Sequence, residues 1–135
     1  MSMTGKWKEK DLFKFVNDEF YGDLVKAKNP MSRWDCYSPH YSHRIEFKCR
    51  TKHYDTLLIE KGKYDAMLKE SKKHLDIPMF IVSTPNGVYR FNLLKMDIAW
   101  EVNSKNPATT YFGDSRRRVT KEVGYMDINK AQKLL

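Results

Sequence analysis

The first apolar stretch of the chain has a helical period. Apolar side chains recur among polar ones at spacings of three and four residues: Leu12, Phe13, Val16 and Phe20. Such spacing places them on one face of an amphipathic helix. The pattern predicts a helix over residues 8–21, with Gly22 as its stop signal. Glu19 borders the apolar stripe, where it either reaches a site beside the core or stays a solvated edge carboxylate.

Residues 34–50 alternate between apolar and charged side chains. Such a period of two predicts strands, here an antiparallel pair with a turn between His40 and Tyr41. One face would carry Ile45, Phe47 and Cys49, and the other Glu46, Lys48 and Arg50.

The turn makes Asp35 and Glu46 direct cross-strand neighbours. Such neighbours have Cβ atoms roughly 4.5–5.5 Å apart, and like charges placed there repel each other. A divalent cation between the carboxylates would remove the repulsion, and carboxylate ligands with waters and a phosphate suit Mg²⁺. Lys48 lies on the same face as Glu46, where it could hold a water or a phosphate oxygen.

The rest of the chain alternates short apolar runs with one further helix. The apolar patterns, with Gly, Pro and Asn as turn and break signals, predict a short strand at 24–26, a strand at 56–60 and, after a break at Gly62, a helix over 63–75. Two further strands are predicted at 79–84 and 88–93, joined by a turn at Asn86-Gly87. The rest of the chain is predicted to form a strand at 98–103, a loop at 104–110 and a terminal helix over 127–135. This order predicts an α/β (α+β) fold with a single mixed β-sheet flanked by helices.

Composition restricts the class of protein further. A chain of 135 residues is long enough for one domain with a core. It carries 25 Lys and Arg against 17 Asp and Glu, a formal charge of +8, which favours polyanionic partners. No apolar run approaches the roughly 20 residues that a membrane helix needs, so we expect no membrane partner and an intracellular protein. Cys36 and Cys49 are too few for a disulfide framework and are expected to be thiols.

The strand pair, together with the helix that precedes it, resembles the PD-(D/E)XK nuclease superfamily. The matching residues are Asp35 on one strand and Glu46-Phe47-Lys48 on the next. Small phage and archaeal DNA endonucleases and Holliday-junction resolvases are the members it looks most like. The resemblance implies a restriction-endonuclease-like core over about residues 9–95, with a C-terminal extension over about 96–135, in a single nuclease-like domain.

The resemblance also implies roles for residues of this chain. Asp35, Glu46 and the backbone carbonyl of Phe47 would hold Mg²⁺ (or Mn²⁺), joined by Glu19 from the first helix. Lys48 would position the attacking water. Lys63 is the candidate for a catalytic lysine on the following helix, with Lys61 as its rival, although the strand at 56–60 interrupts the usual order and leaves Glu60 as another acidic contributor.

Basic residues are candidates for following a nucleic-acid backbone. They are Arg33, Arg44, Arg50, Lys52, Lys61 and the cluster Arg116, Arg117 and Arg118. Tyr37 and Tyr41 either stack on bases or pack against the sheet. The prediction is therefore a Mg²⁺-dependent nuclease acting on DNA in the cytoplasm of a prokaryotic or phage-infected host cell. Many such enzymes are dimers, so the resemblance also allows a homodimer.

Three other interpretations compete with this one. A zinc site is suggested by the density of Cys36, His40, His43, Cys49 and His53, although their spacings fit no common zinc motif. A non-catalytic basic nucleic-acid-binding module, such as a decayed nuclease, would explain the charge but not the apposed carboxylates. In the third, Glu46 and Lys48 only form the solvent face of a strand.

Overall fold

A mixed six-stranded sheet forms the centre of the molecule. The computed structural model describes residues 3–107 and 118–135. In spatial order the sheet consists of β1 (Val25–Lys26), β2 (Cys36–Ser38), β3 (His43–Cys49), β5 (Ile77–Thr84), β6 (Gly87–Asn92) and β9 (Gln132–Lys133). The central neighbours β3 and β5 are parallel, and the other pairs are antiparallel. The expected mixed sheet flanked by helices is confirmed.

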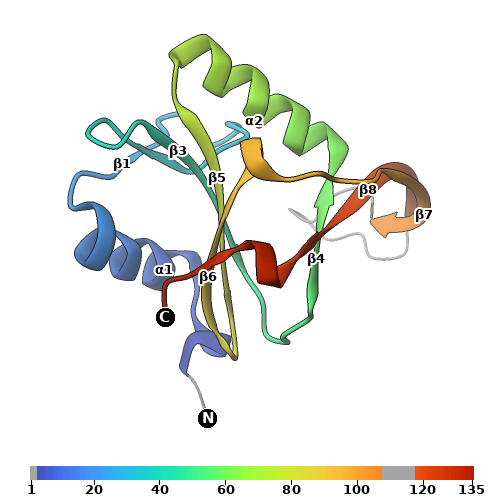
Figure 1. Cartoon of the computed structure of the whole chain (residues 1–135), viewed down its shortest axis with the longest axis horizontal. Helices are drawn as coiled ribbons and strands as arrows, with labels where there is room; N and C mark the ends of the chain where they lie inside the picture. Colours follow the sequence, from blue (N-terminus) through green and yellow to red (C-terminus); the bar gives the residue numbers. More distant parts are fainter. Residues whose placement is uncertain (1–2, 108–117) are drawn as a thin grey trace.

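The two long helices cover opposite faces of this sheet (Figure 1). α1 (Glu9–Val16) continues through a π-helical turn (Asn17–Tyr21) and ends at Gly22, whose φ of 83° permits the left-handed stop. Met79 and Ile81 of β5 pack toward α1, whereas the alternate residues Phe80 and Val82 pack toward α2 (Lys61–His74). β5 is therefore buried on both faces, which agrees with its continuous apolar run.

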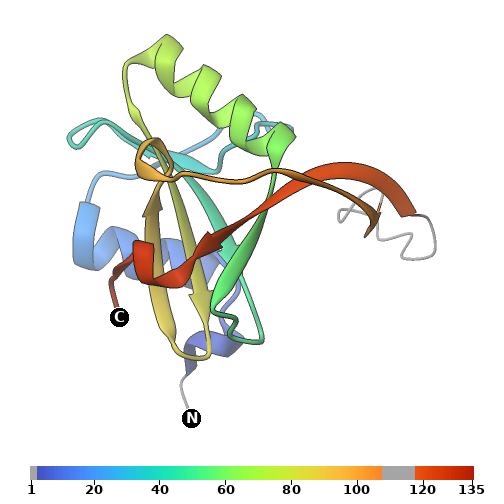
Figure 2. The same ribbon diagram turned by 45° about the vertical axis from the view of Figure 1, so that its right-hand side comes forward.

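A second sheet of three strands was not predicted. It consists of β4 (Thr56–Glu60), β8 (Arg118–Asp127) and β7 (Glu101–Pro107), in the order β4-β8-β7. Strand β4 pairs with β8 instead of the main sheet, and its buried Leu57 and Ile59 pack in the core with Met126 of β8 and Met67 of α2. The expectation of a single sheet is corrected accordingly, and Figure 2 shows β8 extending away from the main sheet.

Helix α2 starts two residues earlier than predicted. Gly62 lies within its first turn and is no break, because one glycine costs only about 1 kcal/mol in a helix. The path from β3 through β4 and α2 to β5 forms the crossover that a parallel strand pair needs.

The C-terminal predictions were partly wrong. Strand β7 starts at Glu101 and occupies part of the expected loop, and the expected terminal helix is a 3-10 turn, Ile128–Lys130, followed by β9. The turn forms because the Asp127 side chain accepts the Asn129 N–H at 2.9 Å, and β9 forms because a strand edge of β6 is free to pair. Arg116 and Arg117 lie outside the described residues.

Gly124 allows the segment before β7 to cross β8 closely. A Cβ at this position would lie 2.2 Å from Ile98 Cγ2 and 3.1 Å from Trp100. The ring of Trp100 in turn packs against the ring of Tyr64 on α2, with the ring centroids 5.2 Å apart. This contact links the segment before β7 to the helix. Within the described ranges, none of the helices has both the length and the apolar character needed to traverse a bilayer.

Candidate functional site

The predicted register of the strand pair is confirmed, with Cys36 opposite Ile45. Asp35 lies directly before β2, and its N–H donates to the Ile45 carbonyl at 2.8 Å. Its Oδ2 accepts the N–H of Phe47 at 2.7 Å, which turns the carboxylate toward β3. The side chain of Asp35 is thereby fixed next to Glu46, which is only 5 % exposed.

Three carboxyl groups meet at this point. Burial raises the pKa of Glu46 to about 8, and hydrogen bonding to Asp35 and its charge add to the effect, against the opposing charge of Lys63. Burial also raises the pKa of Glu9 to about 7, and the hydrogen bond with Asp35 and the charge of Asp35 add to this shift. Glu9 and Glu46 therefore ionise less readily than ordinary glutamates, mainly because they are removed from water and lie beside Asp35.

Two lysines border the carboxyl groups. Lys63 of α2 forms an ion pair with Glu46, so the sequence-based choice of Lys63 is placed at the site. Lys48 is half-buried, and burial together with the charges of Lys63 and Arg50 lowers its pKa. A lysine with a lowered pKa exchanges a proton more readily near neutral pH than an exposed one does.

The helix carboxylate of the site is Glu9 and not Glu19. Glu9 opens α1 and hydrogen-bonds with Asp35, whereas Glu19 lies in the π-helical turn at the other end of the helix. Ten residues of helix correspond to about 15 Å, which places Glu19 out of reach. The available sequence signal was the preference for acidic residues in the first turn of a helix, which Glu9 follows.

Arg44 is a structural residue and not an exposed phosphate contact. Its guanidinium is buried, pairs with Asp76 at 2.7 Å and lies 4.3 Å from the ring centroid of Trp34. Lys61 likewise pairs with Asp65 on the surface of α2, at 2.7 Å. The structure therefore brings Lys63, and not Lys61, to the carboxyl groups.

The other predicted basic contacts differ in accessibility. Arg33 and Lys52 are exposed, Arg50 is half-buried, and Arg118 opens β8.

Glu60, the alternative acidic contributor, is the N-cap residue of α2 and pairs with Lys121 at 2.9 Å.

The histidines and cysteines of residues 36–53 do not assemble. His43 is hydrogen-bonded to the Tyr21 hydroxyl at 2.6 Å, and His53 to the Thr84 hydroxyl at 2.9 Å. Cys36 is a buried free thiol in the core beneath α1. In this fully described segment no three potential zinc ligands come together.

The chemistry of the carboxyl groups fits a hard divalent cation. Glu9, Asp35 and Glu46 offer oxygen ligands, and their mutual repulsion is what a bound cation relieves. Over residues 3–107 and 118–135, no three acidic, His or Cys side chains stand in a preformed metal-binding arrangement. Lys63 occupies one oxygen of Glu46, so metal binding requires this lysine to move or to share the carboxylate.

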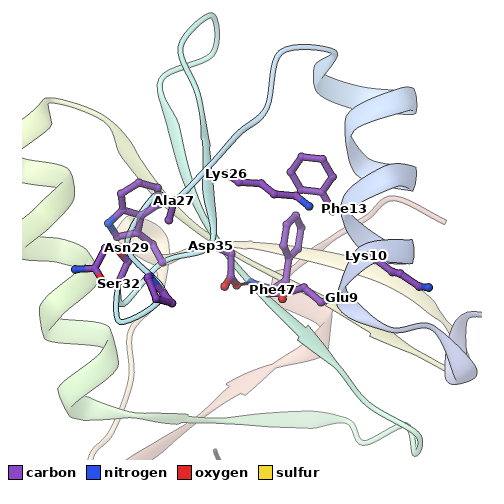
Figure 3. A pocket seen from close by; sticks show the side chains of 11 residues that line it. Glu9, Lys10, Phe13, Lys26, Ala27, Asn29, Ser32, Asp35 and Phe47 are labelled. Carbon is purple, nitrogen blue, oxygen red and sulfur yellow. Dashed lines mark hydrogen bonds between the residues drawn. The ribbon is translucent and has the colours of Figure 1, made fainter.

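A cavity of about 360 Å³ opens directly beside Asp35. The start of α1 forms one wall, with Glu9, Lys10 and Phe13, and the loop before β2 forms the other, with Asn29 and Ser32. Figure 3 shows Asp35 between these walls, with Phe47 and Glu9 next to it. Two of the three carboxyl groups, Glu9 and Asp35, therefore line a hollow large enough for a small ligand, whereas Glu46 lies buried behind Asp35.

Comparison with known proteins identifies the fold. No protein-family model matches the sequence, and no curated protein matches it. Among solved structures, the chain is similar to Archaeoglobus fulgidus Hjc, a Holliday junction resolvase from an archaeal hyperthermophile. The TM-score is 0.60 at 10 % sequence identity, over 96 % of this chain and 91 % of that one. The expected restriction-endonuclease-like fold is thus confirmed.

Proposed function

We propose that this protein is a divalent-metal-dependent nuclease that hydrolyses phosphodiester bonds in DNA. The observation that carries the proposal is that Glu9, Asp35 and Glu46 lie close together near Lys48, with Glu9 and Asp35 lining a cavity. The similarity of fold to a protein described as a Holliday junction resolvase supports it.

Each residue has a role that follows from its position. Asp35 and Glu46 would hold Mg²⁺ or Mn²⁺, with Glu9 and the carbonyl of Phe47 as further oxygen ligands. When bound, the metal supplies a lowered pKa for water and Lewis acidity toward the phosphate. Lys48, whose pKa is lowered, would orient the attacking water and stabilise negative charge on the phosphate.

More specifically, the proposed nuclease is a phage-type endonuclease or a Holliday-junction resolvase. It would act in the cytoplasm of a prokaryotic or phage-infected cell. The exposed Arg33 and Lys52 and the cluster at 116–118 would follow the DNA backbone. A homodimer would allow paired cuts on two strands.

Cleavage of a substrate panel tests the proposal. Plasmid, linear duplex, single-stranded and four-way-junction DNA would be incubated with Mg²⁺, with Mn²⁺ and with EDTA. We expect metal-dependent cleavage that Lys48→Ala abolishes without lowering the melting temperature. Binding without cleavage of any substrate would instead identify a non-catalytic nucleic-acid-binding module.

A further inference from the structure

The cavity beside Asp35 combines aromatic walls with polar groups. Phe13, Phe47 and Trp34 contribute the rings, and Asn29 and Ser32 contribute hydrogen-bonding groups. Aromatic side chains with a few placed polar groups are the usual lining of a ligand site. Planar heteroaromatic molecules suit such a lining because they stack on rings and hydrogen-bond at their edges.

The walls are held in place by neighbouring charges and rings. The Arg44 guanidinium lies over one face of Trp34 at 4.3 Å, which fixes the indole ring. Phe13 and Phe47 meet edge to face with centroids 6.2 Å apart. The Asn29 Oδ1 accepts the N–H of Met31 at 2.9 Å, which orients the side-chain amide of Asn29.

The charge around the cavity suits a ligand that is attached to phosphate. Lys10 and Lys26 line it, and the Lys26 ammonium lies 4.9 Å from the ring centroid of Phe13. Glu9 and Asp35 lie on the same cavity, so a phosphate bound to a metal there would be next to these lysines.

We propose that this cavity receives a single unstacked nucleobase next to the phosphodiester being cut. The inference rests on the proposed nuclease function and specifies its substrate. A volume of about 360 Å³ is near the lower end of ligand pockets and admits one base and not a base pair. Phe13 and Trp34 would stack on the base, and Phe47 would support Phe13 from the core, while Asn29 and Ser32 would hydrogen-bond to the edge of the base.

The proposal determines which DNA is cut fastest. Removing a paired base from a duplex costs a few kcal/mol, and the cost is least for a mismatched or unpaired base. The protein would therefore prefer DNA with an unpaired nucleotide at the cut, such as a mismatch, a gap or a branch point.

Cleavage of matched oligonucleotides tests this preference. Each substrate would have the nucleotide on either side of the mapped cut paired, unpaired, or unpaired and lacking its base. We expect at least tenfold faster cleavage with the unpaired base than with the paired one, and loss of this gain in the abasic substrate. Equal rates on all three would overturn the subsite and leave the nuclease proposal intact. Absence of cleavage and binding on every DNA would overturn both.

A cavity-filling variant provides a second, independent readout. Ser32→Trp places a large ring inside the cavity, and Met31→Trp places the same ring one residue away, where Met31 is 81 % exposed and does not line it. Affinity would be measured by fluorescence anisotropy with EDTA present, after melting curves have shown that both variants fold. Ser32→Trp is expected to lose the preference for the unpaired base, and Met31→Trp to keep it. If both keep it, the base does not enter this cavity.

Discussion

The ammonium group of Lys63 lies against the carboxylate of Glu46, although one residue belongs to α2 and the other to β3. The Glu46 side chain is 6 % exposed and that of Lys63 is 28 % exposed. Among neighbouring carboxyl groups, Lys63 thus supplies the positive charge that a bound metal would otherwise supply. A metal bound here would compete with the lysine for the Glu46 oxygen that the lysine contacts.

Replacing Lys63 should therefore strengthen metal binding and weaken the fold. We expect Lys63→Met to bind Mn²⁺ several-fold more tightly by titration calorimetry, because no ammonium has to be displaced. Without metal the variant should be less stable by roughly 1–3 kcal/mol in urea, since a buried carboxyl group loses its partner. Lys61→Met, which removes the surface pair with Asp65 and a contact with the Trp100 ring but does not touch Glu46, is the matched control. Unchanged Mn²⁺ affinity in Lys63→Met would show that the lysine does not compete.

Stability without metal should fall as the pH rises. The pKa of Glu46 is about 8 in the folded protein against an ordinary value of 4.5, so the folded state binds more protons between these values. The free energy of unfolding must then decrease from about pH 5 to pH 8. Urea unfolding in EDTA at pH 5.5 and pH 8.5 measures this change.

Glu46→Gln removes the titrating group and identifies the source of the pH dependence. We expect this variant to lose the Glu46 share of the decrease, with the Glu9 share remaining, and to exceed the wild type in stability at pH 8.5 by an amount on the order of a few kcal/mol. Glu19→Gln, an exposed substitution, should leave the profile unchanged. A wild-type slope that persists in Glu46→Gln would assign the effect to another group.

Metal binding should release protons. Glu46 and Glu9 are both partly protonated at pH 7, because their pKa values are about 8 and about 7. A divalent cation binds the ionised forms, so its affinity should increase with pH and its binding should expel about one proton near pH 7. Calorimetry in two buffers of different ionisation enthalpy counts these protons. A buffer-independent enthalpy would contradict the assignment of these two groups as ligands.

Glu9 and Glu19 should differ in their effect on the metal. We expect Glu9→Gln to weaken Mn²⁺ binding at least tenfold and to reduce cleavage in parallel, because Glu9 adjoins Asp35. Glu19→Gln should change neither quantity. Equal effects of the two substitutions would mean that Glu9 acts only through the general charge of the helix.

The basic residues should divide into structural and DNA-binding groups. Arg44→Ala leaves buried Asp76 unpaired and should cost about 3–5 kcal/mol of stability. Lys52→Ala should keep the melting temperature and lower the slope of log affinity against log salt by up to about one unit, if this lysine binds a phosphate. Anisotropy titrations at several salt concentrations measure that slope. An unchanged slope would leave Lys52 as a solubilising charge.

Local sequence patterns predicted the elements that are set by nearby residues. The register of β2 and β3 and the strand at 56–60 are determined by alternation, and both are confirmed. The hairpin between β5 and β6 is also confirmed, but its turn lies one residue earlier than predicted, at Pro85-Asn86, because Gly87 already pairs with Thr84. The partner of a strand depends on distant residues, so β4 could not be assigned to the second sheet from its own pattern. Glu9 was missed for a similar reason, because only the tertiary fold brings the start of α1 to Asp35.

The departure of β4 from the main sheet has a consequence for the order of folding. Thr56 of β4 pairs with Asp127 of β8, so the core beneath α2 is complete only after most of the chain is available. The three carboxyl groups belong to the first 46 residues, which leave the ribosome well before β8 does. Contacts between distant segments form slowly. The carboxyl groups should therefore gather first, and Lys63 should take its final position beside Glu46 late in folding.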